Sequence, residues 1–165
     1  MSIDPGVDGY ALGWVKDDPS PVGYCAALHP ESLWALFTRV QARVAVVEGQ
    51  YIGNPQIAGS VLDLGFRMGI SIGWVAAVMH GSLETQQERT LHLFTAPPSS
   101  WQAHQRRVAG IMGRLDRATG LRLTVARGEK MFGFQDEWKR ATKKQREGMA
   151  SALGIGEWWR SLWLK

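Results

Sequence analysis

Two acidic residues stand where apolar segments of the sequence end. Asp4 follows the short apolar start Ser2-Ile3, and Glu48 follows the apolar run at residues 44–47. If these segments are neighbouring strands, both carboxylates emerge side by side at one edge of a sheet. Two close carboxylates repel each other, and a divalent cation relieves that repulsion. Mg²⁺ prefers such oxygen ligands, and two ions about 3.5–4 Å apart activate water for phosphodiester cleavage.

Each acid also has an ordinary structural explanation. Asp4 is followed by Pro5-Gly6, and Asp-Pro-Gly is a common turn. A glutamate after an apolar strand is often just the first solvated residue, which would account for Glu48. Either feature alone is weak evidence of catalysis, so the hypothesis of a metal site depends on the pair and on the order of the strands.

The elements that must position these acids follow the order strand, strand, strand, helix, strand. Residues 10–15 and 22–28 have the composition of strands, and a helix opens at residues 30–33. The run that ends at Glu48 is apolar throughout, as strands buried in parallel pairing are. A further strand is expected at residues 90–95. The pattern predicts an α/β domain with a mixed five-stranded sheet flanked by helices.

Three further helices are predicted on the remaining sequence, and one of them is a short helix that starts at residues 99–102. The first spans about residues 56–80 and carries Gly65, Gly69 and Gly73 four positions apart on one face. Glycine costs about 1 kcal/mol in a helix interior, so this face either packs tightly on the sheet or forms a subunit interface. The last helix is predicted at about residues 142–153.

The composition describes the setting in which the domain works. A chain of 165 residues with 45% hydrophobic content is enough for one compact domain, so residues 1–165 are taken as a single unit. The net charge of +4 favours a polyanionic partner, although an ordinary solvated surface would have the same charge. A single cysteine, Cys25, favours a reducing, cytoplasmic compartment. We expect no signal peptide and no membrane span.

Five segments, taken in order along the chain, together resemble RuvC-type Holliday-junction resolvases, especially their phage and prophage branch. They match the opening of that family, its second acidic motif, its glycine-rich helix, a Pro-Ser-x-Trp segment and the basic start of its last helices. These segments are residues 3–11, 46–51, 65–77, 96–101 and 143–146. No single motif is specific, but the ordered set is.

The resemblance implies an RNase H-like fold and a metal-dependent endonuclease that hydrolyses Holliday junctions or other branched DNA. It implies that Asp4 and Glu48 are catalytic metal ligands for Mg²⁺, with two ions expected and Mn²⁺ as a substitute. It also implies a homodimer, because a two-fold junction needs two symmetric cuts. The face with Gly65, Gly69 and Gly73 is the candidate interface. A bacterial or phage-infected cytoplasm would be the location.

The resemblance also implies residues that contact DNA. Tyr51 matches an aromatic position that stacks on bases at the junction centre, although an aromatic residue packed in a loop would look the same. Basic side chains would contact phosphates, which fix register rather than sequence. These are Arg106, Arg107, Lys143, Lys144 and Arg146.

Two departures from the family pattern bear on activity. The family carries further acids on its final helix, typically as Asp-x-x-Asp-Ala, and this sequence reaches residues 162–165 without them. The chain is then truncated, or another acid substitutes, or the protein is a degenerate member that binds branched DNA without cutting it. The apolar residues 158–164 favour truncation, the alternative being that they dock on a partner.

The second departure is a long basic stretch before the last predicted helix. Residues 106–146 hold twelve Lys and Arg against four Asp and Glu. We treat residues 106–142 as an insertion that either contacts DNA or is simply solvated.

Overall fold

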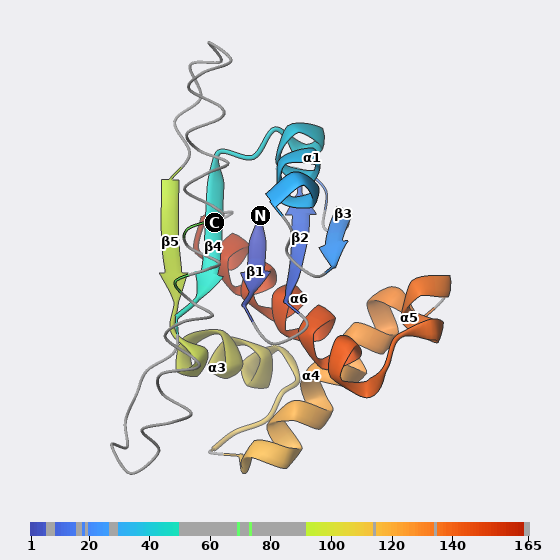
Figure 1. Ribbon diagram of the computed structural model, residues 1–165. Helices are drawn as coiled ribbons and strands as arrows, with labels where there is room; N and C mark the ends of the chain where they lie inside the picture. Colours follow the sequence, from blue (N-terminus) through green and yellow to red (C-terminus); the bar gives the residue numbers. More distant parts are fainter. Residues whose placement is uncertain are drawn as a thin grey trace.

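The computed structural model describes residues 1–5, 9–15, 18, 20–26, 30–49, 69, 73, 92–113, 115–133 and 135–163. In this part of the chain one five-stranded sheet is flanked by helices (Figure 1). The strands are β1 (Ser2–Asp4), β2 (Tyr10–Trp14), β3 (Pro21–Ala26), β4 (Val44–Glu48) and β5 (His92–Ala96). The helices are α1 (Pro30–Val40), α3 (Pro98–Val108), α4 (Arg117–Phe132), α5 (Asp136–Arg140) and α6 (Lys143–Trp163).

The sheet is mixed, with the strand order β3-β2-β1-β4-β5. Strands β1, β2 and β3 pair antiparallel, as a meander at the start of the chain. Strands β1 and β4 pair parallel, and so do β4 and β5. The predicted mixed five-stranded sheet flanked by helices is confirmed, and β4 has the bounds that its apolar run predicts.

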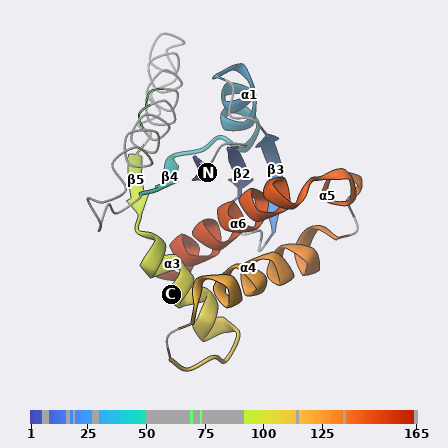
Figure 2. The same cartoon turned by 60° about the horizontal axis from the view of Figure 1, so that its bottom comes forward.

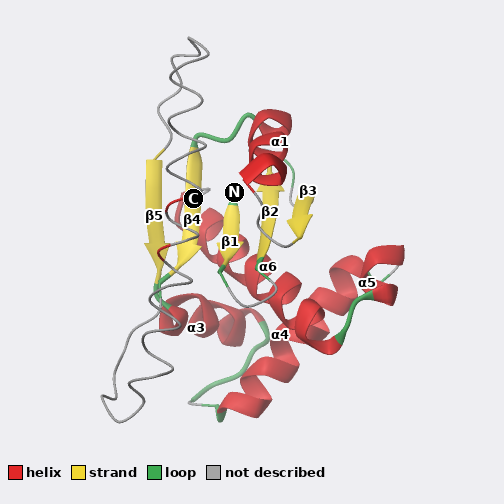
Figure 3. Cartoon of the chain, in the orientation of Figure 1, coloured by secondary structure: helices red, strands yellow, loops and turns green. Residues whose placement is uncertain are grey.

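Strand alternation divides the side chains between two cores. Ile3, Ala45 and Val47 are fully buried on the face that α1 covers. Because successive side chains of a strand point to opposite faces, the residues between them belong to the other face. Val46 accordingly packs with Trp101 of α3 and Ile155 of α6. Figure 3 shows α1 and α6 on opposite sides of the strands. The same alternation turns the acids at the ends of β1 and β4 toward α3 and α6.

Helix α6 lies close against its neighbours because two of its residues are glycines. A Cβ atom at Gly154 would lie 2.3 Å from Gln105 Nε2, and one at Gly156 would lie 2.4 Å from the ring of Trp14. The prediction that the last helix ends near residue 153 is wrong. The helix continues to Trp163, and the glycines admit side chains of α3 and β2.

The end of α6 packs on the edge of the sheet. The rings of Trp159 and Phe94 of β5 have centroids 4.5 Å apart, and Trp158 packs on the same core cluster. Trp163 stacks at 5.6 Å on Trp159 and keeps 67% of its surface exposed. Much of the apolar segment at residues 158–163 therefore finds its partners within this domain.

The basic segment forms helices that cover the same face as α6. Figure 2 shows α4 lying along α6. Arg127 of α4 pairs with Glu157 of α6, with Nη2 and Oε1 2.5 Å apart. The hydroxyl of Tyr10 in β2 donates to Glu137 Oε1 of α5 at 3.1 Å. These contacts attach the segment at residues 106–142 to the sheet face that carries the acids.

Part of the predicted glycine face lies outside the described residues. Tyr51 and Gly65 fall there, together with most of the helix predicted at residues 56–80. Gly69 and Gly73 are described and helical, and no described atom lies within 4 Å of a Cβ built at either one. Their predicted role in a dimer interface stays a prediction. Of the helices described, none combines the length and apolarity that crossing a bilayer requires.

Candidate active site

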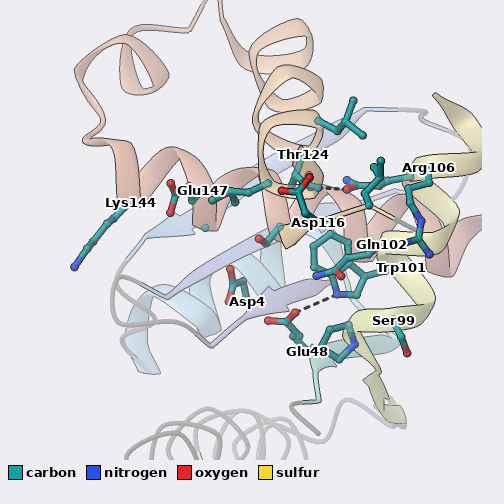
Figure 4. A pocket seen from close by; sticks show the side chains of 18 of the residues that line it. Asp4, Glu48, Ser99, Trp101, Gln102, Arg106, Asp116, Thr124, Lys144 and Glu147 are labelled. Carbon is teal, nitrogen blue, oxygen red and sulfur yellow. Dashed lines mark hydrogen bonds between the residues drawn. The ribbon is translucent and has the colours of Figure 1, made fainter. Parts of the chain in front are cut away.

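Strands β1 and β4 bring the two predicted acids together. They run parallel with Ser2 opposite Val46 and Ile3 opposite Val47, so the next level of this register holds Asp4 and Glu48. Both residues end their strands, and both point to the face covered by α6. Figure 4 shows the two carboxylates next to each other in one cleft.

The protein environment resists full ionisation of this pair. Asp4 is 8% exposed and Glu48 is 7% exposed. Burial raises the pKa of Glu48 from 4.5 to about 7, and the charge of Asp4 adds to this effect. Two buried carboxylates are more readily ionised when a cation is bound between them. The pair therefore has the electrostatic character of a site that gains stability from a divalent cation.

Trp101 of α3 is a member of the site that the sequence did not identify. Its Nε1 donates to Glu48 Oε1 at 3.1 Å, within a buried environment. This hydrogen bond favours the ionised carboxylate and so lowers the pKa of Glu48, against the effect of burial. Trp101 reaches this place because β5 runs parallel to β4 and α3 begins at Pro98, just after β5 ends. The signal in the sequence was the Pro-Ser-x-Trp segment, whose tryptophan stands one turn into the helix.

The carboxylates lie in a cleft of about 1220 Å³ whose walls come from α3, α4 and α6. The wall from α3 includes Ser99, Gln102 and Arg106. The wall from α4 includes its N-cap residue Asp116, whose carboxylate accepts from the amide of Thr119 at 2.9 Å. Asp116 is thus engaged in capping a helix, which leaves Asp4 and Glu48 as the acids at the base of the cleft.

Two of the predicted DNA-binding cations line the cleft. Arg106 enters it from α3 and Lys144 from α6, and Figure 4 shows them on opposite sides of the carboxylates. Arg107 and Lys143 are exposed next to them in the sequence but do not line the cleft. Cations on both sides of an acidic centre match a phosphate backbone that crosses it.

Arg146, the third predicted cation of α6, makes structural contacts instead. Its guanidinium donates to the carbonyl oxygen atoms of Trp138 and Lys139 at 2.9 and 3.0 Å. It also lies 5.8 Å from the centroid of the Trp138 ring. Arg146 thus ties the end of α5 to α6, and its contact with DNA stays a prediction.

Helix α6 presents Glu147, Gly148 and Ser151 to the cleft. The sequence from Gly148 to Ala152 has the spacing of the Asp-x-x-Asp-Ala pattern, with glycine and serine in place of the two acids. Because α6 packs against β1 and β4, Gly148 and Ser151 line the same cleft as Asp4 and Glu48. The role of these two positions stays a matter for the proposal below.

The residues present fit a cation held by two protein carboxylates. In the described part of the chain, no three His, Cys, Asp or Glu side chains lie close enough together to bind a metal ion. Mg²⁺ commonly uses one or two carboxylates and completes its shell with water and substrate phosphate oxygens. Asp4 and Glu48 satisfy that requirement. A second ion would need a further ligand, for which Glu147 of α6 is a candidate on the cleft wall because Asp116 caps α4.

Comparison with known proteins supports the fold and nothing finer. No family model matches the sequence, and no curated protein matches it. A solved structure of RuvC from Thermus thermophilus is similar, with a TM-score of 0.54, 13% identity, and coverage of 97% of this chain and 94% of that one. T. thermophilus RuvC in complex with a Holliday junction substrate gives a TM-score of 0.51, 13% identity, and coverage of 97% and 93%. The chain therefore has the RuvC-like, RNase H-like fold, as the sequence predicted, and the likeness to a phage branch stays a prediction.

Proposed function

We propose that this protein is a metal-dependent endonuclease that hydrolyses phosphodiester bonds in branched DNA such as four-way junctions. The observation that carries the proposal is the buried pair of Asp4 and Glu48 at the base of a cleft with cations on both sides. Branched DNA is the proposed substrate because the chain shares its fold with a protein whose structure holds a Holliday junction.

We assign the residues of the cleft three roles: metal binding, orientation of a carboxylate and phosphate binding. Asp4 and Glu48 would hold Mg²⁺, which supplies an activated water and stabilises negative charge on phosphate oxygens when bound. Trp101 orients the Glu48 carboxylate through its hydrogen bond. Arg106 and Lys144 would bind phosphates on either side and so place one phosphodiester over the acids.

Several finer expectations belong to the same proposal. Tyr51 would stack on bases at the junction centre, and Mn²⁺ would substitute for Mg²⁺. Two symmetric cuts would need a homodimer, for which Gly65, Gly69 and Gly73 remain the candidate face. Sedimentation of the protein with and without junction DNA would determine the number of subunits.

The test is cleavage of an end-labelled synthetic four-way junction in Mg²⁺ or Mn²⁺. The Asp4→Asn variant should lose cleavage and keep junction binding, because it removes a metal ligand and no phosphate contact. Asp116→Asn is the matched control, since it removes a carboxylate from the same cleft and asparagine remains a good N-cap. The proposal would be refuted if Asp4→Asn cleaved the junction at the wild-type rate.

One observation favours a second function, a protein that binds branched DNA without cutting it. Gly148 and Ser151 bring no carboxylate to the face of α6 beside Asp4 and Glu48. This candidate predicts salt-sensitive junction binding and no cuts in any divalent metal. The same assay separates the two functions, because both require binding and only the first yields nicks.

A further inference from the structure

The end of α3 and the loop that leads to α4 carry apolar side chains that are exposed to solvent beside the cleft. Met112 is 94% exposed and Val108 is 62% exposed, with the half-buried Ile111 between them. Gly113 and Leu115 of the same loop line the cleft that holds the acids. Figure 2 shows this loop extending beyond the helices that it joins.

The chain geometry at the end of α3 holds this tip outward. Gly110 has a φ of +70°. The amide of Ile111 donates to the carbonyl of Arg106 at 3.0 Å, and the amide of Gly110 donates to that of Arg107 at 3.0 Å. This pair of bonds is a Schellman motif, which satisfies the last carbonyls of a helix and sets the direction of the chain that leaves it.

The other end of the loop is also held by a cap. Gly113 has a φ of +98°, a conformation that favours glycine. Asp116 then caps α4 by accepting from the amide and hydroxyl of Thr119 at 2.9 and 2.6 Å. The hydrogen bonds of these two caps hold both ends of the loop. Part of the entropic cost of ordering the tip for binding is therefore already met within the fold.

The charge around the tip indicates which partner it suits. Residues 92–115 contain no aspartate or glutamate, and Arg106 and Arg107 directly precede the tip. Arg106 also lines the cleft. Apolar side chains next to cations that bind phosphate are the usual composition of a wedge that enters between base steps. A protein partner would not need the tip to adjoin a cleft with two buried acids.

We propose that Met112, supported by Val108 and Ile111, inserts between bases at the branch point of the DNA substrate. This inference rests on the proposed function and adds a residue that selects branched over linear DNA. Bases at a branch are less constrained than those in a continuous stack, so unstacking them costs less. Arg106 would hold the adjoining phosphate, which places the branch point next to Asp4 and Glu48.

The test uses a four-way junction with 2-aminopurine beside the crossover, in Ca²⁺ buffer so that binding is measured rather than cutting. The fluorescence of 2-aminopurine rises when its base leaves the stack. Wild-type protein should raise it, whereas Met112→Ser should not. Met112→Ser should also bind the junction about tenfold more weakly, as expected from loss of one buried apolar side chain, with unchanged affinity for linear duplex.

Val15→Ser is the matched control. Val15 is 45% exposed and follows the last residue of β2, whereas the cleft lies at Gly9, before the first residue of that strand. Its variant should behave as wild type in both measurements. Equal junction affinity and equal fluorescence for Met112→Ser and wild type would overturn the wedge and leave branched-DNA binding intact. Failure of the wild-type protein to prefer the junction over duplex would overturn the proposed function and the wedge together.

Discussion

Replacing Glu48 with glutamine should stabilise the metal-free protein at alkaline pH. The change removes the negative charge that burial and Asp4 disfavour. It keeps the shape of the side chain, and the amide oxygen of glutamine can still accept the hydrogen bond from Trp101. The variant therefore removes a charge that is unfavourable in the folded state and keeps the packing contacts of the side chain.

The magnitude follows from the pKa of Glu48 in the two states. In the folded protein the pKa of Glu48 is about 7, and its ordinary value of 4.5 applies to the unfolded chain. Below pH 4.5 both states hold the proton, so Glu48 has no effect on stability there. Between the two pKa values only the folded state keeps the proton, and stability falls by about 1.4 kcal/mol per pH unit. Above the folded-state pKa the free energy of unfolding is lower by about 3 kcal/mol. The Glu48→Gln variant should regain this stability.

The assay is urea unfolding of wild type and Glu48→Gln in EDTA at several values between pH 4.5 and 8. The two proteins should be equally stable at the acid end, and the variant should gain steadily toward pH 8. Glu147→Gln is the control, because it removes a partly exposed charge from the same cleft. It should change stability by less than about 0.5 kcal/mol, as most surface substitutions do.

Addition of Mg²⁺ at pH 8 gives a second readout from the same proteins. A cation that binds both carboxylates should raise the stability of wild type and have a much smaller effect on Glu48→Gln. A pH-independent difference between the two proteins in EDTA would show that Asp4 and burial do not act on Glu48 as argued. Equal Mg²⁺ stabilisation of both proteins would show that Glu48 is no metal ligand.

Two further changes test the packing around the acids. Trp101→Phe should raise the pKa of Glu48 further and cost the metal-free protein about 1.5–3 kcal/mol above neutral pH, because a hydrogen bond to a carboxylate is lost. The carboxyl carbon shift of Glu48, followed by NMR against pH, would measure this, and an unchanged or lower pKa would contradict it. Gly156→Ala should cost about 1–3 kcal/mol, because its methyl group would meet the ring of Trp14. Gly120→Ala in α4, where no described atom lies within 4 Å of a Cβ, should instead be neutral or stabilising in thermal unfolding, and equal losses for both alanines would refute the packing argument.

The sheet and its two acids were predictable because strands carry a strong local signal. The run at residues 44–47 is apolar at every position and rich in valine, which is typical of a strand buried on both faces, and β4 has those bounds with Glu48 added. The short start before Asp4 carries the buried residue Ile3 but also the polar residue Ser2, so its signal is weaker. Parallel pairing of the two then follows from the intervening helix, because a parallel connection needs a crossover.

The helices around the cleft were less predictable because their glycines have tertiary causes. Gly128 lies in the middle of α4, where a Cβ would meet the ring of Trp138 at 2.5 Å. Gly154 and Gly156 in α6 face side chains of α3 and β2 in the same way. Read from sequence alone, each looks like a break in a helix. The segment at residues 106–142, which we treat as an insertion in the sequence because of its length and basic composition, contributes α4 to one wall of the cleft.

The partner of Glu48 was also beyond local reasoning. Trp101 stands far from Glu48 in the sequence, and their contact requires β5 to pair parallel with β4 and α3 to turn back over that edge. Neither condition has a local signal. That Gly148 and Ser151 of α6 line the cleft is likewise visible only after the helix beside β1 is known.

The cleft joins the two ends of the chain, which has a consequence for how the protein is made. Asp4 lies in the first strand and its wall residues Lys144 and Ser151 lie in the last helix. At about 5–20 residues per second, a ribosome needs roughly 7 to 30 s to pass from one to the other. During that interval β1, α1 and β4 are free to assemble, but the carboxylates have no cleft around them. The wall that α6 contributes is therefore complete only after residues 143–163 have been synthesised, so the DNA cleavage that we propose also requires α6.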